Sequence, residues 1–131
     1  MRLARWSIAV YKLPYPQPVR WKDTVEDGGL FLLLRLFSDS GLEGVAEGTL
    51  KPTWTGTTPR ATAAALEDML LPAVQRTDLA DPLAVRAALE RFPENTLAKA
   101  LVDNACWDLR AQEADMPLWR LWGGTREVPL S

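Results

Sequence analysis

The sequence predicts an α+β fold, a three-stranded antiparallel sheet followed by a bundle of three to four helices. Alternating or continuous apolar stretches, which are typical of strands, occur within residues 1–50. The second half contains two helix starts in which a capping residue precedes proline, at Thr58-Pro59 and Asp81-Pro82. Strands followed by helices are the element order of an α+β domain.

The three predicted strands follow from different patterns. In the first, Trp6, Ile8 and Val10 alternate with polar or small residues. The second is almost continuously apolar, and the third follows it after the turn sequence Ser-Asp-Ser-Gly, so these two strands form a hairpin. The predicted strands span residues 5–10, 30–37 and 42–50.

Residues 13–29, between the first two strands, contain Pro14, Pro16 and Pro18. We predict a loop here, of about 17 residues, which is long for a connection in a compact domain and typical of functional or disordered segments. A second connection, residues 50–57, marks the change from strands to helices.

The helices are predicted from their start and stop signals. Thr58-Pro59 opens a helix to about residue 71, which Pro72 ends or kinks. Asp81-Pro82 opens a second helix, through residue 91 or 92. The longest helix runs from residue 95 or 96 to about residue 114, and a short last helix begins at Pro117 and ends at Gly123-Gly124.

The longest helix has two distinct faces at about 100° per residue. One narrow arc, predicted to face solvent, holds Lys99, Asp103, Arg110 and Glu113. Asp108 lies near the middle of the opposite, apolar arc, with Asn104 beside it. An unpaired buried carboxylate is costly, so we expect Asp108 to accept hydrogen bonds from backbone N–H groups or to pair with an arginine such as Arg120.

Composition excludes several kinds of function. A chain of 131 residues fits one domain and is too short for a (β/α)8 barrel, which needs about 250 residues. A formal net charge of −2 leaves no basic surface for nucleic acid. No apolar run approaches the about 20 residues of a membrane helix, and the N-terminus has no signal-peptide pattern. We therefore expect a cytoplasmic protein that binds neither nucleic acid nor membrane.

The absence of histidine removes further classes of chemistry. Without histidine, and with a single cysteine, the sequence cannot form a Ser-His-Asp or Cys-His nucleophile system or a conventional zinc site. The cysteine, Cys106, is predicted to be a small packing residue. Phosphate-binding and dinucleotide-binding glycine motifs are also absent.

A series of short motifs occurs along the chain in a fixed order. Residues 41–47 read Gly-Leu-Glu-Gly-Val-Ala-Glu, and residues 56–59 read Gly-Thr-Thr-Pro before the first long helix. Trp107-Asp108, a Pro-Leu turn at 117–118, Leu-Trp-Gly-Gly at 121–124 and Val-Pro at 128–129 follow. Together they resemble the N-terminal capping domain of the enolase superfamily, in its mandelate racemase/muconate lactonizing enzyme branch, with Ala46 at a position where that family more often has glycine.

The resemblance implies that residues 1–126 form the capping domain and that residues 127–131 begin the first strand of a catalytic barrel whose remainder is absent from this chain. Enzymes of the family abstract the proton α to a carboxylate and hold the enolate on a divalent metal, usually Mg²⁺. Their metal ligands and acid/base residues lie on barrel strands. The resemblance therefore implies no catalytic residue and no metal ligand in this chain, and Mg²⁺ in the missing barrel.

The implied function is that of a substrate-capping and specificity domain in a racemase, epimerase, cycloisomerase or dehydratase, so the parent protein would be an isomerase or lyase. Its partners would be a carboxylate-bearing small molecule and its own C-terminal barrel. Because the apolar surface that meets the barrel would be uncovered, we also expect homo-oligomers.

In this family two loops of the capping domain close over the barrel and set substrate preference. They correspond here to residues 13–29 and 50–57. The residues predicted to bind substrate are Tyr15, Arg20, Trp21 and Lys22 in the first loop and Lys51, Thr53 and Trp54 in the second. The tryptophans would supply apolar contact area, and Arg20 or Lys22 could bind a distal carboxylate.

The alternative for these residues is that the tryptophans pack on their own sheet and the cations are only solvated. Asp108, Asn104 and Glu47 are predicted to be structural polar residues. For the whole chain, one alternative is a free-standing α+β module that binds a protein or a small ligand. Another is a small enzyme that uses two of Glu26, Asp27 and Glu47 as an acid/base pair, although no pattern places these carboxylates in a shared apolar pocket.

Overall fold

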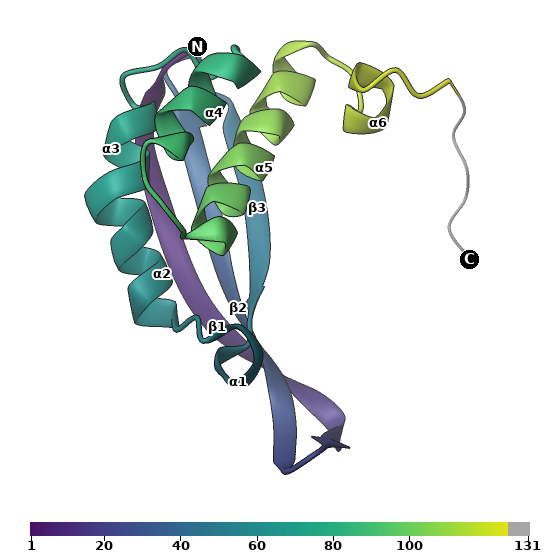
Figure 1. Ribbon diagram of the computed structural model, residues 1–131. Helices are drawn as coiled ribbons and strands as arrows, with labels where there is room; N and C mark the ends of the chain where they lie inside the picture. The colour runs from purple at the N-terminus through teal and green to yellow at the C-terminus, as the bar shows by residue number, and fades with distance from the viewer. Residues whose placement is uncertain (126–131) are drawn as a thin grey trace.

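The computed structural model describes residues 1–125 and shows one sheet covered by helices on one face (Figure 1). The strands are β1 (Leu3–Trp21), β2 (Thr24–Ser38) and β3 (Glu43–Leu50), which pair antiparallel in the order β1-β2-β3. The predicted α+β class and three-stranded antiparallel sheet are confirmed. The domain boundary predicted at residues 126 and 127 lies outside the described residues.

The strand register assigns the side chains to two faces of the sheet. Leu32, Leu34 and Leu36 of β2 are fully buried on the face that meets the helices. Leu34, for example, lies opposite Ile8 of β1 and Ala46 of β3. Because successive strand residues point to opposite faces, the odd-numbered residues of β2 lie on the face away from the helices. The nearly continuous apolar sequence of β2 reflects apolar residues on both faces.

In the part of the chain that the structure describes, six α-helical segments and one π-helical turn follow the sheet. They are α1 (Pro52–Thr55), α2 (Pro59–Ala65), η1 (Leu66–Leu70), α3 (Leu71–Val74), α4 (Pro82–Glu90), α5 (Thr96–Glu113) and α6 (Leu118–Leu121). The helix starts predicted at Thr58-Pro59 and Asp81-Pro82 are confirmed. The Thr58 hydroxyl accepts a hydrogen bond from the Ala61 N–H, and the Asp81 carboxylate accepts bonds from Leu83 and Ala84.

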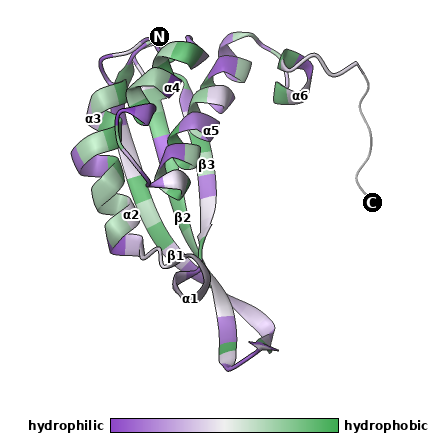
Figure 2. Ribbon diagram, viewed as in Figure 1, coloured by the Kyte–Doolittle hydropathy of each residue, from purple (hydrophilic) through white to green (hydrophobic). Residues whose placement is uncertain are grey.

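Helix α5 packs directly on β3, and two glycines allow the close approach. A Cβ atom on Gly44 would lie 2.3 Å from the carbonyl oxygen of Ala105, and one on Gly48 would lie 2.9 Å from a methyl carbon of Leu97. The buried side of α5 includes Leu101, Ala105 and Leu109, as predicted. Figure 2 shows apolar residues along the sheet and along the helices that cover it.

Pro72 does not end the first long helix, which was one of its two predicted effects, but the helix is distorted just before it. The helix continues from α2 through η1 into α3 and ends only after Val74. Proline cannot donate an i→i−4 hydrogen bond, and its ring collides with the carbonyl four residues earlier. The chain widens into a π-turn just before Pro72, where the Leu71 N–H bonds to the Leu66 carbonyl, and this turn accommodates the proline.

The prediction of a loop at residues 13–29 is wrong. β1 and β2 both run far past the core and form a two-stranded ribbon that turns at residues 22 and 23 (Figure 1). The prolines are tolerated because β1 is an edge strand, and the ladder shifts register between Pro14 and Val19. We call residues 13–29 the ribbon.

The prediction that Arg110 faces solvent is wrong. Its side chain is only 6% exposed, its Nε donates a hydrogen bond of 2.8 Å to the Leu79 carbonyl, and its guanidinium carbon lies 4.6 Å from the centre of the Trp107 ring. The two terminal nitrogens have no hydrogen-bond partner among the described residues. Burial lowers the pKa of this guanidinium. The connection between α3 and α4 covers this turn of α5, a contact that helical periodicity does not reveal.

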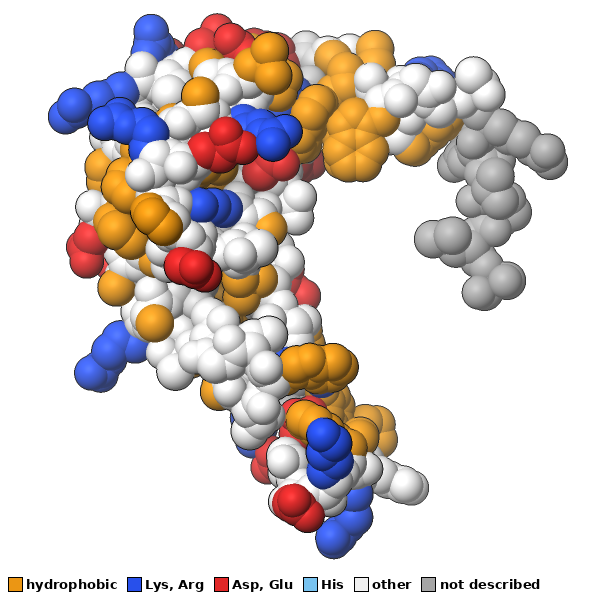
Figure 3. All heavy atoms as spheres, viewed as in Figure 1, with side chains coloured by type: hydrophobic (Ala, Val, Ile, Leu, Met, Phe, Trp, Pro, Cys, Tyr) orange, Lys and Arg blue, Asp and Glu red, His pale blue; other side chains and the backbone are white. Residues whose placement is uncertain are grey.

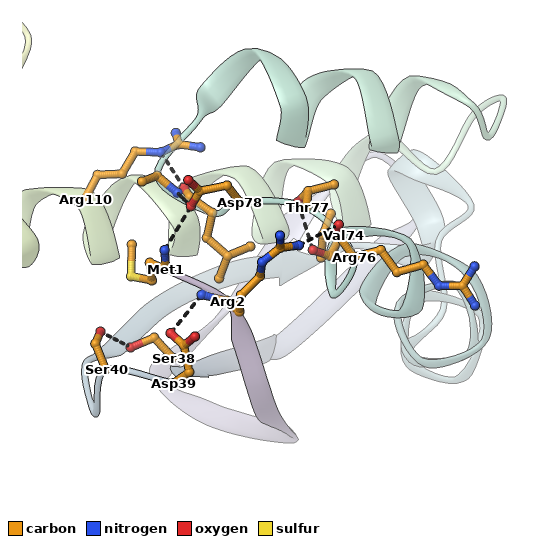
Figure 4. A network of polar contacts seen from close by, with 12 residues as sticks. Met1, Arg2, Ser38, Asp39, Ser40, Val74, Arg76, Thr77, Asp78 and Arg110 are labelled. Carbon is orange, nitrogen blue, oxygen red and sulfur yellow. Dashed lines mark hydrogen bonds and ion pairs between the residues drawn. The ribbon is translucent and has the colours of Figure 1, made fainter.

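The same connection holds the start of β1, at the end of the molecule opposite the ribbon (Figure 4). The α-ammonium group of Met1 lies 3.0 Å from the Asp78 carboxylate. Arg2 donates from its side chain to the Arg76 carbonyl and from its backbone to the Asp39 carboxylate. These contacts fix one end of the sheet and leave the ribbon end for another role.

Candidate functional site

The two segments predicted to bind substrate meet at the ribbon end of the molecule. The Trp21 ring, next to the turn of the ribbon, lies 5.7 Å from the Trp54 ring of α1, with a tilt of 43° between the planes. Trp54 remains 71% exposed. The pair therefore connects the ribbon to α1 and still presents an indole ring to solvent.

A cavity of about 310 Å³ lies between the ribbon and α1 and contains both signs of charge. Lys51 lies 3.6 Å from Glu26, and Lys12 lies 2.7 Å from Asp27. The hydrogen bond from Lys12 lowers the pKa of the Asp27 carboxyl group below its ordinary value. Lys51 also lies 5.5 Å from the centre of the Trp54 ring, within the range of a cation–π contact. Its contact with Glu26 is the looser of the two ion pairs.

The other predicted residues divide into two groups. Tyr15 and Thr53 line the same cavity as Lys51. Arg20 and Lys22 are exposed on the ribbon and have no ion pair among the described residues, and Lys22 occupies the turn with φ of 49°. The structure thus brings together Tyr15, Trp21, Lys51, Thr53 and Trp54, and leaves Arg20 and Lys22 at the tip. Figure 3 shows apolar, cationic and anionic side chains mixed at this end.

Helix α1 has few contacts that would hold it in place. None of its residues is buried. On its other side lies a larger cavity, of about 560 Å³, lined by Thr55 and Thr57 and by residues of β3, α2 and the start of α5. A segment with a cavity on each side can change position with little loss of packing.

The predicted structural polar residues have different surroundings. The Asp108 carboxylate accepts a hydrogen bond of 2.9 Å from the Val45 N–H and a second from the Gln112 amide, and it is partly exposed. It makes no ion pair with Arg120, which instead lies over the Trp119 ring. Asn104 is exposed, and its side chain has no hydrogen bond among the described residues. Glu47 accepts a hydrogen bond from Tyr11 on the sheet face away from the helices.

The described residues offer little other chemistry. Among residues 1–125, no group of three or more His, Cys, Asp or Glu side chains is placed to hold a metal ion. Cys106 is fully buried, and desolvation raises the pKa of its thiol to about 12. None of the helices in this part of the chain is long and apolar enough to cross a membrane.

Sequence reasoning did not place Lys12, Glu26 or Asp27 in the site. The sequence suggests a role for Glu26 and Asp27 only in the alternative that two of Glu26, Asp27 and Glu47 form an acid/base pair, and Glu26 and Asp27 are each paired with a lysine. The available signal was Gly28-Gly29. A Cβ on Gly28 would lie 2.9 Å from a carbon of the Lys12 side chain, and one on Gly29 would lie 3.4 Å from the Tyr15 hydroxyl. Adjacent glycines in a strand often mark such close approaches.

Comparisons with known proteins identify the family to which the chain belongs. The family described as "Mandelate racemase / muconate lactonizing enzyme, N-terminal domain" matches residues 7–123. The N-succinylamino acid racemase of Thermus thermophilus is 36% identical over 130 residues, which are 98% of this chain and 35% of that protein. The chain thus spans about a third of the length of this relative.

Solved structures show the same fold. A mandelate racemase/muconate lactonizing enzyme homologue from Roseovarius nubinhibens, complexed with magnesium, superposes with a TM-score of 0.90 at 26% identity, over 98% of this chain and 35% of that one. A dipeptide epimerase from Enterococcus faecalis, complexed with Mg and L-Leu-L-Tyr, gives a TM-score of 0.82 at 21% identity, over 92% and 34% of the two chains. The latter similarity concerns the fold alone.

Proposed function

We propose that this chain closes the mouth of a catalytic barrel and selects the substrate there. The chain belongs to the mandelate racemase/muconate lactonizing enzyme family of the enolase superfamily, as its N-terminal capping domain. The complete enzyme would abstract the proton α to a carboxylate. Among racemases, epimerases, cycloisomerases and dehydratases, the identity to a racemase favours a racemase or epimerase.

The contact between Trp21 and Trp54 is the observation that supports this proposal. It joins two segments that are distant in the sequence and that lie at the end of the molecule away from the contacts that fix β1. A lid must exclude water from the reaction and still open for the substrate. Two connected segments with few buried side chains meet both requirements.

Each predicted lid residue then has a defined role. The indole rings of Trp21 and Trp54 cover the apolar part of a substrate. Lys51, held only loosely by Glu26, binds an anionic group distant from the reacting carbon, and Tyr15 and Thr53 donate hydrogen bonds beside it. Arg20 and Lys22 attract a carboxylate at the tip. These roles favour carboxylic acids that carry an apolar or acyl-linked side group.

The chemical step belongs to the barrel in this proposal. The carboxylates of the described residues do not form a site that fits Mg²⁺. The metal, with ligands on barrel strands, would offset the charge of the enediolate, and residues 127–131 would begin the first of those strands. The cytoplasmic location stays a prediction from the sequence.

A domain exchange tests the proposal. The capping domain of the Thermus thermophilus racemase is replaced by residues 1–126 of this chain, and exchange of the α-proton of an N-succinylamino acid with D₂O is followed by NMR. We expect exchange, and we expect Lys51→Met and Trp54→Ala to lower kcat/KM by about tenfold or more. Arg86→Ala, on the exposed side of α4, serves as the control that leaves kcat/KM unchanged. A folded, metal-loaded chimera that shows no exchange would overturn the proposal, as would lid variants with unchanged kcat/KM.

A further inference from the structure

Two pairs of a lysine and a carboxylate line the cavity between the ribbon and α1, and the two pairs differ in geometry. Lys12 and Asp27 lie 2.7 Å apart, and their side chains are 53% and 74% exposed. Lys51 and Glu26 lie 3.6 Å apart, and their side chains are only 33% and 18% exposed. The first pair is therefore a close contact in water, whereas the second is a longer contact in a more enclosed place.

Glu26 and Lys51 lie at the border between the apolar layer and the ribbon. Side chains of a strand alternate between two faces, so Glu26 belongs to the row of β2 that also holds Leu30 and Leu32. Leu30 and Leu50 are strand partners at the end of the ladder between β2 and β3, and Lys51 follows directly. The sequence thus continues a row of buried leucines with a carboxylate and places a lysine opposite it.

Lys51 is the cation of this cavity that retains bonding capacity for a ligand. Hydrogen bonds between an ammonium group and a carboxylate are usually about 2.7–2.9 Å long, so the contact at 3.6 Å leaves the ammonium protons of Lys51 without a good acceptor. Its other contact among the described residues is with the Trp54 ring, at 5.5 Å. Attraction between charges strengthens as water is excluded, and exposed pairs contribute little. An anion would therefore gain more from Lys51 than from the exposed Lys12.

We propose that Glu26 is the internal counter-ion of Lys51 and that a carboxylate on the distal part of the substrate displaces it. The inference rests on the proposed function, because it concerns a residue of the lid. In the empty lid, Glu26 neutralises Lys51. When the distal carboxylate enters, the ammonium group of Lys51 turns toward it, and water hydrates the released Glu26 carboxylate through the open side of the cavity. Glu26 thereby competes with the substrate for the same cation.

This competition makes Glu26 a residue that determines specificity. A ligand with a carboxylate and an apolar body can contact Lys51 and the Trp54 ring together. A neutral ligand of the same shape offers no charge in exchange, so it leaves the pair of Glu26 and Lys51 intact. Because an enclosed charge without a partner is costly, that intact pair lets the lid close over neutral groups as well. Removal of the Glu26 charge should therefore favour acids with a second carboxylate over neutral analogues.

Titration of this chain with a small probe tests the displacement without a barrel. The probe is 3-phenylpropionate, which has one carboxylate and an apolar ring, and 3-phenylpropionamide is its neutral counterpart. Binding is followed by the NMR shift of the Trp54 indole N–H. Glu26→Gln should bind 3-phenylpropionate about three- to fivefold more tightly than wild type does, the effect expected from the loss of one partly exposed ion pair. Its affinity for the amide should equal that of wild type.

Three further variants separate this displacement from a general effect of charge. Lys51→Met removes the cation and should abolish the preference for the carboxylate over the amide. Asp27→Asn frees the other lysine and should tighten binding less than Glu26→Gln, because Lys12 is more exposed. Glu90→Gln makes the same change of net charge on the exposed side of α4 and should leave binding unchanged. Circular dichroism verifies that each variant is folded.

The outcomes distinguish this inference from the proposed function. The displacement is refuted if folded Glu26→Gln binds 3-phenylpropionate no more tightly than wild type, if Asp27→Asn gains as much, or if no variant binds the probe. The domain exchange with the racemase decides the proposed function separately. An inactive chimera together with the expected probe binding would refute only the proposed function. An active chimera together with unchanged binding by Glu26→Gln would refute only the displacement.

Discussion

Gly44 faces the carbonyl group of Ala105 so closely that a Cβ atom at residue 44 would lie 2.3 Å from the oxygen and 2.6 Å from the Leu109 side chain. The neighbouring atom is backbone within the long helix α5, which cannot move aside cheaply. Gly44→Ala should therefore lower the free energy of unfolding by about 1–3 kcal/mol, the usual cost of overpacking a core. Urea denaturation followed by circular dichroism measures this loss.

Gly48→Ala is the matched comparison on the same strand. Its nearest neighbours would be methyl groups of Leu97 and Leu101, at 2.9 and 3.2 Å, and these side chains can rotate. We expect a smaller loss than for Gly44→Ala. Equal losses for the two variants would contradict the importance of the close backbone contact.

The contact between Trp21 and Trp54 predicts how the ribbon moves. Trp54→Ala removes the ring that connects α1 to the turn of the ribbon. Aromatic pairs contribute about 0.5–1.5 kcal/mol beyond their area, so amide hydrogen exchange near the turn should accelerate by about two- to tenfold. NMR-detected exchange measures the effect residue by residue. Trp122→Ala, which removes an indole ring next to α6, is the control. If Trp122→Ala accelerated exchange near the turn of the ribbon as much as Trp54→Ala does, the contact between Trp21 and Trp54 would have no local role.

Asp108 and Asn104 offer a second matched comparison, one turn apart on α5. Asp108→Ala leaves the Val45 N–H without its acceptor, and we expect a loss of about 1 kcal/mol in the free energy of unfolding. Asp108→Asn retains an acceptor oxygen and should lose less. Asn104→Ala should change stability by less than about 0.5 kcal/mol. Thermal denaturation of the three variants gives the order, and a larger loss for Asn104→Ala would reverse our assignment.

The ion pair between Met1 and Asp78 predicts a pH dependence of stability. The pKa of Asp78 lies below its ordinary value of 3.8, first because of the Ala80 N–H and then because of the Met1 ammonium group. The pKa of that ammonium group lies above its ordinary value of 8.0 because of its hydrogen bond to Asp78. The carboxylate's contribution is therefore present above pH 3.8 and lost as the pH falls through the lowered pKa. The ammonium group's contribution is present below pH 8.0 and lost as the pH rises through the raised pKa.

Asp78→Asn isolates this effect, because asparagine keeps an oxygen acceptor for the Ala80 N–H and loses the charge. The difference in stability between wild type and variant should be largest between about pH 4 and pH 8 and should decline on both sides. Thermal denaturation across pH 3–10 provides the measurement. A difference that stays constant over this range would show that the ion pair does not contribute.

The fold was predictable because local patterns determine most of it. The hairpin of β2 and β3 and the helix starts at Thr58 and Asp81 depend on neighbouring residues, and the structure agrees with them. The errors involve longer-range effects. Pro72 stays inside a helix because a π-turn precedes it, and Arg110 is buried because a connection distant in sequence covers it.

The site was predictable only in part. The family resemblance indicated both lid segments, but it could not show that the proline-rich segment is a ribbon whose turn reaches Trp54. The sequence also did not predict the ion pairs of the cavity, because their partners come from segments that only the folded ribbon brings together. Lys51 and Glu26 come from different segments, and only the strand register brings them within 3.6 Å.

The ribbon extends beyond the fully buried core. The residues that stabilise the fold are therefore different from the residues at the ribbon end. Substitutions at Trp21, Lys51 or Trp54 change no fully buried side chain, so they carry little risk of unfolding the domain. If these residues contact the substrate, as proposed, new substrate preferences would arise by mutation at the ribbon end while the leucine-rich layer between sheet and helices stays the same. Under that proposal, the architecture makes this domain a favourable starting point for directed evolution of specificity.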